Sequence, residues 1–469
     1  MQSFFTKKRL IVLGIVAALI VAGVSFFFYA KSHKTEFAAG GLNLFQKVSQ
    51  LLPISPDTKK EIEVIDKLVS ELTKKDDVTR TYLVMLQNNY ELRPGGGFLG
   101  QYAVIKIKNG EVIYHLVEDA NLLDQRIEAK ITPPYPFTRK MQLKKWKFRD
   151  SNFSPDFPTN AEKAEYFYRL AGGREQFDGT IAVNSDVFDH LLGLTGPITP
   201  AGYSTTFSSE GGALKLEEVV EKSYLGEDVP AELKQNRKAI MKKLAAEMLS
   251  RLATIGNIPK VAELGLTELR NKNVMLHFKD ENLQALVKSV HWDGSVVTDW
   301  NGDYLMLVDA NMGALKTDYY IKRSLEYTVD FTGEKPIATV VQTYQNTAPY
   351  GDWRTSDYHT YLRAFVPKGS KFLERFMINA VLTNEDLGKT YFGGFVDVEI
   401  GQSDVHTTLK YELPDTIKPE NYTLLIQKQS GVGTIPTKVH VITKGKTYDY
   451  ETDLVKDLNF TFQTVDAKK

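Results

Sequence analysis

Apolar and polar residues follow a clear strand pattern from residue 82 onward. Residues 82–86 form a continuous apolar run, which is typical of a buried strand. Residues 99–108 alternate apolar and polar side chains, and the dipeptide Asn109-Gly110 that follows favours a tight hairpin turn. Residues 111–117 then return as the second arm. This stretch therefore predicts one buried strand followed by a β-hairpin.

Helical spacing of apolar residues surrounds this stretch. Apolar residues recur every three or four positions across 58–75, and the same spacing predicts further helices downstream. These elements are expected as helices at 160–171, 185–192, 214–225 and 231–255, with a short strand at 177–184 and a last core strand at 303–309. Helices that alternate with strands indicate an α/β domain, a mixed sheet with packed helices in a three-layer arrangement.

The pattern changes near residue 319, where helical spacing ends. From there on, short strands follow one another at about ten-residue spacing, separated by turn residues. Such a series is typical of an all-β sandwich. We therefore expect an α/β domain at 76–318 and a C-terminal β-sandwich domain at 319–469.

The N-terminal residues predict a membrane anchor. Three basic residues, Lys7, Lys8 and Arg9, precede twenty uncharged residues at 10–29. About 20 apolar residues are enough to cross a hydrocarbon core of about 30 Å. A cleaved signal peptide has a shorter apolar core and a small-residue cleavage site, which Phe26–Tyr29 does not resemble.

This N-terminal pattern sets the expected topology of the whole chain. We predict a cytoplasmic stub at 1–9, a transmembrane signal anchor at 10–30, and a linker with one helix at 31–75. The protein is then a single-pass protein of the cell membrane, with the lipid bilayer as the partner of residues 10–30. The bulk of the chain is expected to be extracytoplasmic.

Composition narrows the classes of chemistry. The chain is 42% hydrophobic and 25% charged, as in ordinary globular proteins, and its 58 basic residues balance its 58 acidic ones. No global positive field attracts nucleic acid, so no nucleic-acid partner is expected. The absence of cysteine excludes disulfides and thiolate catalysis, and the scattered histidines do not form a zinc motif.

The loop after the first strand carries the first candidate chemistry. Arg93 precedes Pro94 and three glycines at 95–97. A guanidinium is a planar fork of donors that suits phosphate or carboxylate, and glycines let a bound group approach the backbone. A structural turn with a surface arginine explains the same residues equally well.

A second polar stretch, RDSNFSPDFP, has neither helical nor strand periodicity. Its polar residues Arg149, Asp150, Asn152 and Asp156 favour a site loop over packing. A third candidate lies near the start of the helix at 231–255. Arg237 there opposes the helix dipole, so it is either solvated or paired with an anion.

Several phrases in this order resemble a known family. LQNNYELRPGGGFLG, RDSNFSPDFP, DGTIAVN, NRKAIM and, in the sandwich, YQNTAPYGDWRTSDYHTYLRAFVPKGS resemble the bacterial membrane-anchored family catalogued as domain of unknown function 4012. The resemblance extends over roughly residues 75–430. It implies topology and fold more than an activity.

The order of features is also distantly similar to the LytR–CpsA–Psr phosphotransferases, which transfer glycopolymers from a polyprenyl-pyrophosphate carrier to peptidoglycan. This resemblance implies a phosphate site made by Arg93, Arg149, Asn152, Gln235 and Arg237. For this chain, it makes Asp119 and Asp150 the candidate catalytic residues, with Asp119 and Asp156 as replacement ligands for Mg²⁺ in an altered site. The chain departs from that pattern, because glycines 95–97 replace a metal-binding aspartate and Glu118-Asp119 replaces an arginine-aspartate pair.

Two hypotheses follow for the function. In the first, the protein is an envelope protein that binds or transfers a glycopolymer linked to polyprenyl-(pyro)phosphate, with a cell-wall polymer as acceptor, and acts as a glycopolymer phosphotransferase. In the second, it is a non-catalytic envelope scaffold or adhesion protein with a degenerate phosphotransferase-like domain.

Overall fold

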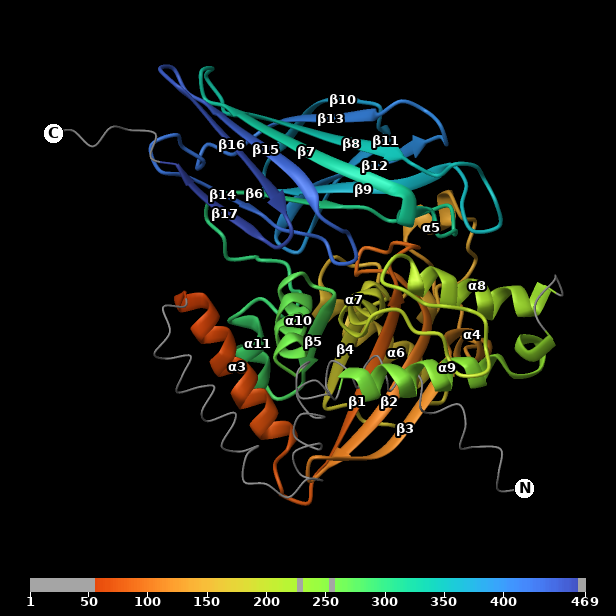
Figure 1. The fold of residues 1–469 in the computed structure, drawn as a ribbon. Coiled ribbons are helices and arrows are strands. Elements are labelled where there is room, and N and C mark those ends of the chain that lie inside the picture. The colour runs from red at the N-terminus through yellow and green to blue at the C-terminus, as the bar shows by residue number, and fades with distance from the viewer. Residues whose placement is uncertain (1–54, 226–230, 253–257, 463–469) are drawn as a thin grey trace. The chain divides into compact units, whose positions relative to one another are not determined.

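The computed structural model describes residues 55–225, 231–252 and 258–462 (Figure 1). The predicted stub and anchor at 1–30 lie outside these residues. Within the described part of the chain, no helix is both long and apolar enough to cross a bilayer.

The chain forms two compact units, each made from separate segments. The first unit contains Leu99–Glu128, Ala161–Gly294 and the residues up to Gln87. The second unit contains Asn88–Phe98, Ala129–Asn160 and Ser295–Lys469.

The first unit contains a mixed five-stranded sheet in the order β3-β2-β1-β4-β5. Its strands are β1 Thr79–Asn88, β2 Phe98–Lys108, β3 Glu111–Asp119, β4 Gly179–Asn184 and β5 Val274–Phe278. β4 runs parallel to β1, and β5 runs antiparallel to β4. The predicted hairpin between β2 and β3 is confirmed, and Asn109 and Gly110 both have positive φ, at 53° and 77°. Such a turn matches the twist of the two strands.

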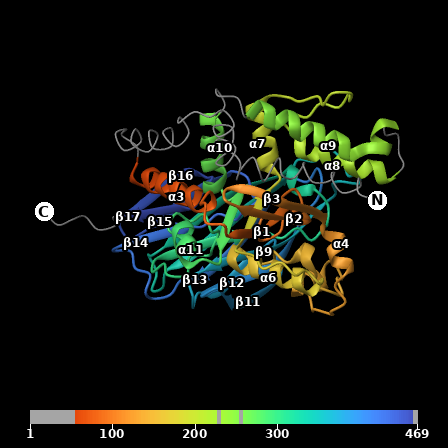
Figure 2. The same cartoon turned by 90° about the horizontal axis from the view of Figure 1, so that it is seen from below.

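Helices cover both faces of this sheet. On one face, alternate residues of β1, β2 and β4 pack in one apolar cluster with helices α3, α7, α9 and α10. On the opposite face lies α6, whose Tyr168 ring packs against Tyr102 and whose Glu165 accepts a hydrogen bond from Thr180. The helices are α3 Pro56–Leu72, α4 Ala120–Gln125, α6 Phe157–Leu170, α7 Asp186–Thr195, α8 Gly212–Leu225, α9 Ala231–Leu252, α10 Ile258–Arg270 and α11 Glu281–Lys288. In Figures 1 and 2, α8 and α9 lie side by side, in agreement with their contacts. The expected α/β class is therefore confirmed for this unit.

The second unit is built on two six-stranded sheets. One has the order β10-β13-β8-β7-β15-β16, and the other has the order β11-β12-β9-β6-β14-β17. The strands are β6 Asp303–Val308, β7 Ile321–Asp330, β8 Ile337–Asn346, β9 Tyr358–Val366, β10 Lys371–Phe376, β11 Asn379–Asp386, β12 Lys389–Val398, β13 Val405–Glu412, β14 Tyr422–Ile426, β15 Ile435–Ile442, β16 Thr447–Leu454 and β17 Leu458–Phe462. Alternate residues from both sheets form one apolar core, so the strand-rich C-terminal region follows the period-two pattern of its sequence.

The second unit also includes short helical segments outside the two sheets. They are α5 Tyr135–Arg139, η1 Phe148–Asp150 and η2 Thr317–Tyr320. Phe137 and Phe153 pack with Tyr361 and Phe395 in an apolar cluster, so the 129–160 segment covers part of one sheet's outer face.

The strand at 303–309 requires a correction. It was expected to complete the α/β sheet, but β6 lies between β9 and β14 in the sandwich. Leu305 belongs to the sandwich core, and Tyr304 and Met306 pack in a second cluster on the other face. A strand buried on both faces has no alternation that could assign it to a sheet. The expected boundary at 318/319 therefore differs from the division at 294/295.

A buried carboxylate, Asp303, begins β6. Its oxygens accept hydrogen bonds from the hydroxyls of Tyr327 at 2.6 Å and Tyr422 at 2.5 Å, and from the backbone N–H of Tyr304 at 2.7 Å. Burial raises the pKa of Asp303 to about 6, although these hydrogen bonds oppose the rise. Desolvation of the charge therefore outweighs the donors.

This raised pKa predicts how stability depends on pH. The unfolded pKa is about 3.9, so between about pH 4 and pH 6 the folded state holds the proton more firmly than the unfolded state does. The free energy of unfolding should therefore fall as pH rises through this window, by at most about 3 kcal/mol from this group. Asp303→Asn should remove this dependence, as measured by urea unfolding of the full chain across the window.

Asp415→Asn is the matched control for this experiment. Asp415 is exposed and pairs with Lys335, which lowers the pKa of Asp415. Its contribution to stability should be lost as pH falls, which is the opposite direction. A difference between wild type and Asp303→Asn that stays constant across the window would contradict the prediction.

Candidate functional site

The loop between β1 and β2, with the strand residues Asn88 and Phe98 at its two ends, forms part of the second unit. Asn311 N donates to Leu92 O at 3.0 Å, and Leu92 N donates to the Asp318 carboxylate at 3.1 Å. On its other side, Gln429 Nε2 donates to Arg93 O at 3.2 Å and to Asp309 O at 2.8 Å. Backbone and amide groups of the sandwich thus fix this loop.

Arg93 is buried in this loop, with 1% of its surface exposed. Its Nη2 donates to Glu91 Oε1 at 2.9 Å and its Nε to Asp150 Oδ1 at 3.1 Å. Its Nη1 donates to the backbone oxygens of Leu92 at 3.3 Å and Asn311 at 3.2 Å. The structure therefore brings Arg93 and Asp150 together, as an internal ion pair.

The charges of this cluster stabilise one another. Burial would lower the pKa of Arg93, but Glu91 and Asp150 outweigh it and the pKa is raised. Burial raises the pKa of Glu91 despite the opposing effect of Arg93. The rings of Phe98 and Phe137 lie 5.3 and 5.6 Å from the guanidinium carbon. Arg93 is thus paired with two carboxylates and enclosed by aromatic rings.

The glycines of this loop allow close approach of the protein's own backbone. A Cβ on Gly97 would overlap the backbone of Asn88, and a Cβ on Gly95 would overlap the Asn160 side chain. Gly431, at φ 80°, lies so close to Gly96 that a Cβ there would overlap the Gly96 carbonyl. Packing within the second unit accounts for these glycines.

The RDSNFSPDFP stretch is held in the same unit by its polar side chains. Asn152 is fully buried and donates from Nδ2 to Gly97 O at 2.6 Å. Asp156 accepts from Thr159 N and Val296 N at 3.1 and 2.9 Å. The Arg149 side chain is 38% exposed, and its Nε lies 3.9 Å from Asp150 Oδ2.

The other predicted site residues belong to the first unit. Asp119 caps α4, where its Oδ1 accepts from Asn121 N at 2.8 Å, and Glu118 forms an ion pair with Arg126 at 2.6 Å. Gln235 and Arg237 lie in α9, where the backbone is described but these side chains are not.

These contacts also bear on the implied magnesium site. Asp119 is engaged as a helix cap, and both oxygens of Asp156 accept hydrogen bonds from N–H groups. Among the described residues, no three acidic or histidine side chains gather as a metal-binding group. Both carboxylates thus make structural contacts within their own units, and Mg²⁺ binding by this pair stays a prediction.

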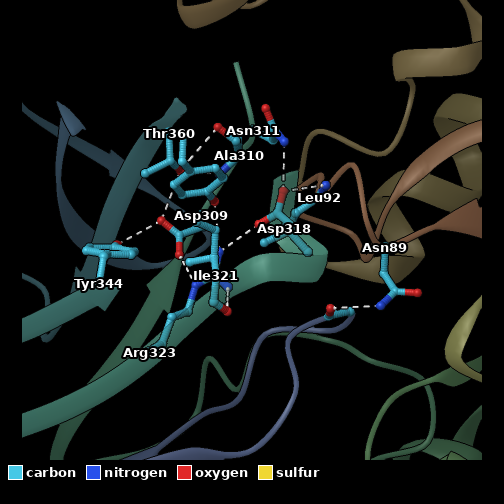
Figure 3. Close-up of polar contacts among 12 residues, drawn as sticks. Asn89, Leu92, Asp309, Ala310, Asn311, Asp318, Ile321, Arg323, Tyr344 and Thr360 are labelled. Atoms are coloured by element: carbon cyan, nitrogen blue, oxygen red, sulfur yellow. Dashed lines mark hydrogen bonds and ion pairs between the residues drawn. The ribbon is translucent and has the colours of Figure 1, made fainter. Parts of the chain in front are cut away.

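A second buried arginine, Arg323, escaped the sequence interpretation. Its Nε donates to Asp309 Oδ2 and its Nη2 to Asp318 Oδ1, both at 2.8 Å. Figure 3 shows both carboxylates directed at Arg323, with Tyr344 and Thr360 also on Asp309. The available signal was one charged residue beside each of two apolar strands, Asp309 at the end of DYLMLVD and Arg323 in IKRS. This pattern does not reveal that the two residues pair with each other.

Loss of Arg93 should destabilise the protein strongly. Arg93→Met leaves Glu91 and Asp150 buried without their cation, which should lower the free energy of unfolding by about 3 to 5 kcal/mol. Arg149→Met removes a partly exposed cation next to Asp150, and it should lower the free energy of unfolding by less than about 1 kcal/mol. Urea unfolding of the full chain measures both values. Equal losses at the two positions would contradict the internal role of Arg93.

Comparison with known proteins identifies one family. Residues 77–218 match the family described as protein of unknown function, DUF4012. No curated protein matches the chain. The match spans the β-hairpin, both polar loops and α7, but neither NRKAIM nor the sandwich phrase that also carried the resemblance. Over residues 77–218, the chain is thus similar to the DUF4012 family of unknown function.

Proposed function

We propose that this protein is a non-catalytic scaffold or adhesion protein of the cell envelope, anchored by its N-terminal apolar segment, with a degenerate phosphotransferase-like domain. We infer a phosphotransferase-like ancestor from the resemblance to the LytR–CpsA–Psr family. We infer that the protein is not catalytic from the loss of phosphate-binding groups.

The burial of Arg93 is the observation that carries this proposal. Phosphoryl transfer depends mainly on cations that face the developing negative charge. Here the guanidinium donates to two carboxylates and two backbone oxygens, and its side chain is 1% exposed. A phosphate would have to displace these internal partners.

The other predicted site residues support the same proposal. Asn152 and Asp156 hold loop backbone, and Asp119 caps a helix. Each of these side chains therefore has a structural task that does not require a substrate. The competing transferase hypothesis rests on Arg149, whose side chain is 38% exposed, and on Arg237.

A ligand-binding experiment separates the two hypotheses. The probe is a short-chain polyprenyl pyrophosphate with Mg²⁺, added to the full-length protein in detergent. We expect no turnover, and no saturable rise in the thermal midpoint that depends on Arg149 or Arg237. A ligand at about 100 times its dissociation constant would stabilise the protein by about 2.7 kcal/mol, so real binding is easily detected.

The matched variants for this test are Arg149→Gln, Arg237→Gln and Arg251→Gln. Arg251 lies on the same helix as Arg237 and pairs with Glu247, so it controls for the loss of a helix cation. A saturable shift that disappears in the first two variants and persists in the third would replace the scaffold proposal with the transferase hypothesis.

The membrane topology can be tested by cysteine labelling, because the chain has no cysteine of its own that would react. Single cysteines can be introduced at Tyr350, which is 63% exposed, and at Ser3 in the predicted stub. In intact spheroplasts, a membrane-impermeant maleimide should label Tyr350→Cys. It should label Ser3→Cys only after the membrane is permeabilised. Labelling of both positions, or of neither, in intact spheroplasts would contradict the proposed orientation.

A further inference from the structure

Arg363 is a third buried arginine of the second unit, on the outer side of β9. Its neighbours Leu362 and Ala364 point into the sandwich core, whereas Arg363 and Phe365 point to the opposite face by the alternation of the strand. On that face Arg363 is only 4% exposed. A cation is thus buried outside the main core.

Among the residues that the structure describes, the contacts of Arg363 satisfy its Nη2 but not its Nε. Its Nη2 donates to Phe153 O at 3.0 Å. The rings of Phe153, Phe365 and Tyr391 lie 4.8, 5.4 and 5.9 Å from its guanidinium carbon. Its Nε is buried and meets no acceptor among the residues that the structure describes. No ion pair of Arg363 occurs within that same part of the chain.

Comparison with the other two buried arginines makes this arrangement unusual. Arg93 pairs with Glu91 and Asp150, and Arg323 pairs with two carboxylates as well. Carboxylates accordingly raise the pKa of Arg93, whereas burial lowers the pKa of Arg363. Among the residues that the structure describes, the second unit therefore supplies a carboxylate partner to two of these cations and none to the third.

The strand opposite Arg363 accommodates this cation. Gly393 of β12 pairs with Arg363 across the sheet, and a Cβ there would lie 3.3 Å from Arg363 Cγ and overlap the Tyr361 ring. The glycine thus leaves space in which the long side chain lies over the sheet. Tyr391 next to it is partly buried, and its ring covers the guanidinium from 5.9 Å.

A second cation on the same face adds to the positive charge. Lys389 lies two residues before Tyr391 on β12, is 4% exposed, and places its Nζ 4.3 Å from the centre of the Tyr304 ring. Burial lowers the pKa of Lys389. In the described residues Lys389, like Arg363, has no ion pair, and the carboxylate of Asp386 acts on Arg363 less than Tyr391 does.

Aromatic stacking does not satisfy this arginine fully. Cation–π contacts stabilise a guanidinium through its faces. The N–H groups lie in the plane of the guanidinium, however, and a buried donor without an acceptor is destabilising. The in-plane edge that carries Nε therefore still requires an acceptor.

We propose that Arg363 binds an oxyanion, the carboxylate or phosphate group of a small ligand, through the guanidinium edge that carries Nε. Oxyanions match this fork with two parallel hydrogen bonds. Phe153 and Tyr391 form the apolar walls of the site. Lys389 contributes positive charge from β12, the strand that carries Tyr391. This site is independent of Arg93 and Arg149, so it goes beyond the scaffold function.

The test uses the full-length protein in detergent with inorganic phosphate and acetate as separate probes. Potassium chloride at matched ionic strength is the reference for each. We expect a saturable rise in the thermal midpoint with at least one probe, and its identity distinguishes a phosphate ligand from a carboxylate ligand. In a ¹⁵N-arginine-labelled sample, the Nε–Hε signal that is missing in Arg363→Lys should shift along the same titration.

Three variants define the residue that responds. Arg363→Met should abolish the response, and Arg363→Lys should weaken the affinity about tenfold, because a lysine keeps the charge but loses the fork. Arg354→Gln, which removes a partly buried arginine paired with Asp352, should respond as wild type does.

The outcomes separate the alternatives. Wild-type midpoints and Nε–Hε signals that are identical in phosphate, acetate and chloride overturn the proposal. A response that persists in Arg363→Lys at full strength also overturns it. Should Arg363→Met fail to fold, the lysine variant and the wild-type titration still decide the question.

Discussion

The second unit depends on one constraint, which is that a buried guanidinium must find acceptors within the chain. Arg93 meets this constraint by contacting Glu91 in its own loop, Asp150 in the next polar stretch, and the backbone of Asn311 after β6. These groups are far apart in sequence. A single side chain therefore joins three segments, and the loop between β1 and β2 is fixed as part of the sandwich unit for this reason.

Such a cluster gives specificity more readily than net stability. The desolvation of a buried ion pair offsets much of its Coulomb attraction, so an apolar replacement of the whole cluster can be equally stable. The charges disfavour other arrangements of the loop, because any of these would leave a buried ion without its partner. Arg323 pairs in the same way with Asp309 and Asp318 near the start of β7, and the backbone N–H of Leu92 links the two clusters by donating to Asp318.

The sequence allowed the local features to be predicted and missed the nonlocal ones. The hairpin turn at Asn109-Gly110 and the helices have short-range causes, so periodicity was sufficient. The place of β6 in the sandwich depends on pairing with β14, more than one hundred residues later. The polar stretch around Asp150 was interpreted as a site loop because it lacks periodicity. Its side chains instead hydrogen-bond loop backbone, and that role leaves no periodic signal either.

The same electrostatics bear on what the protein does. A cation promotes phosphoryl transfer only if its charge is available when negative charge develops on the substrate. At Arg93 two carboxylates already exceed the single positive charge, so an approaching phosphate meets a site that is neutral or negative. Arg363 presents the opposite case, since its charge is buried without a carboxylate partner among the described residues. If this chain recognises an anion, the outer face of β9 is electrostatically better prepared for it than the glycine loop.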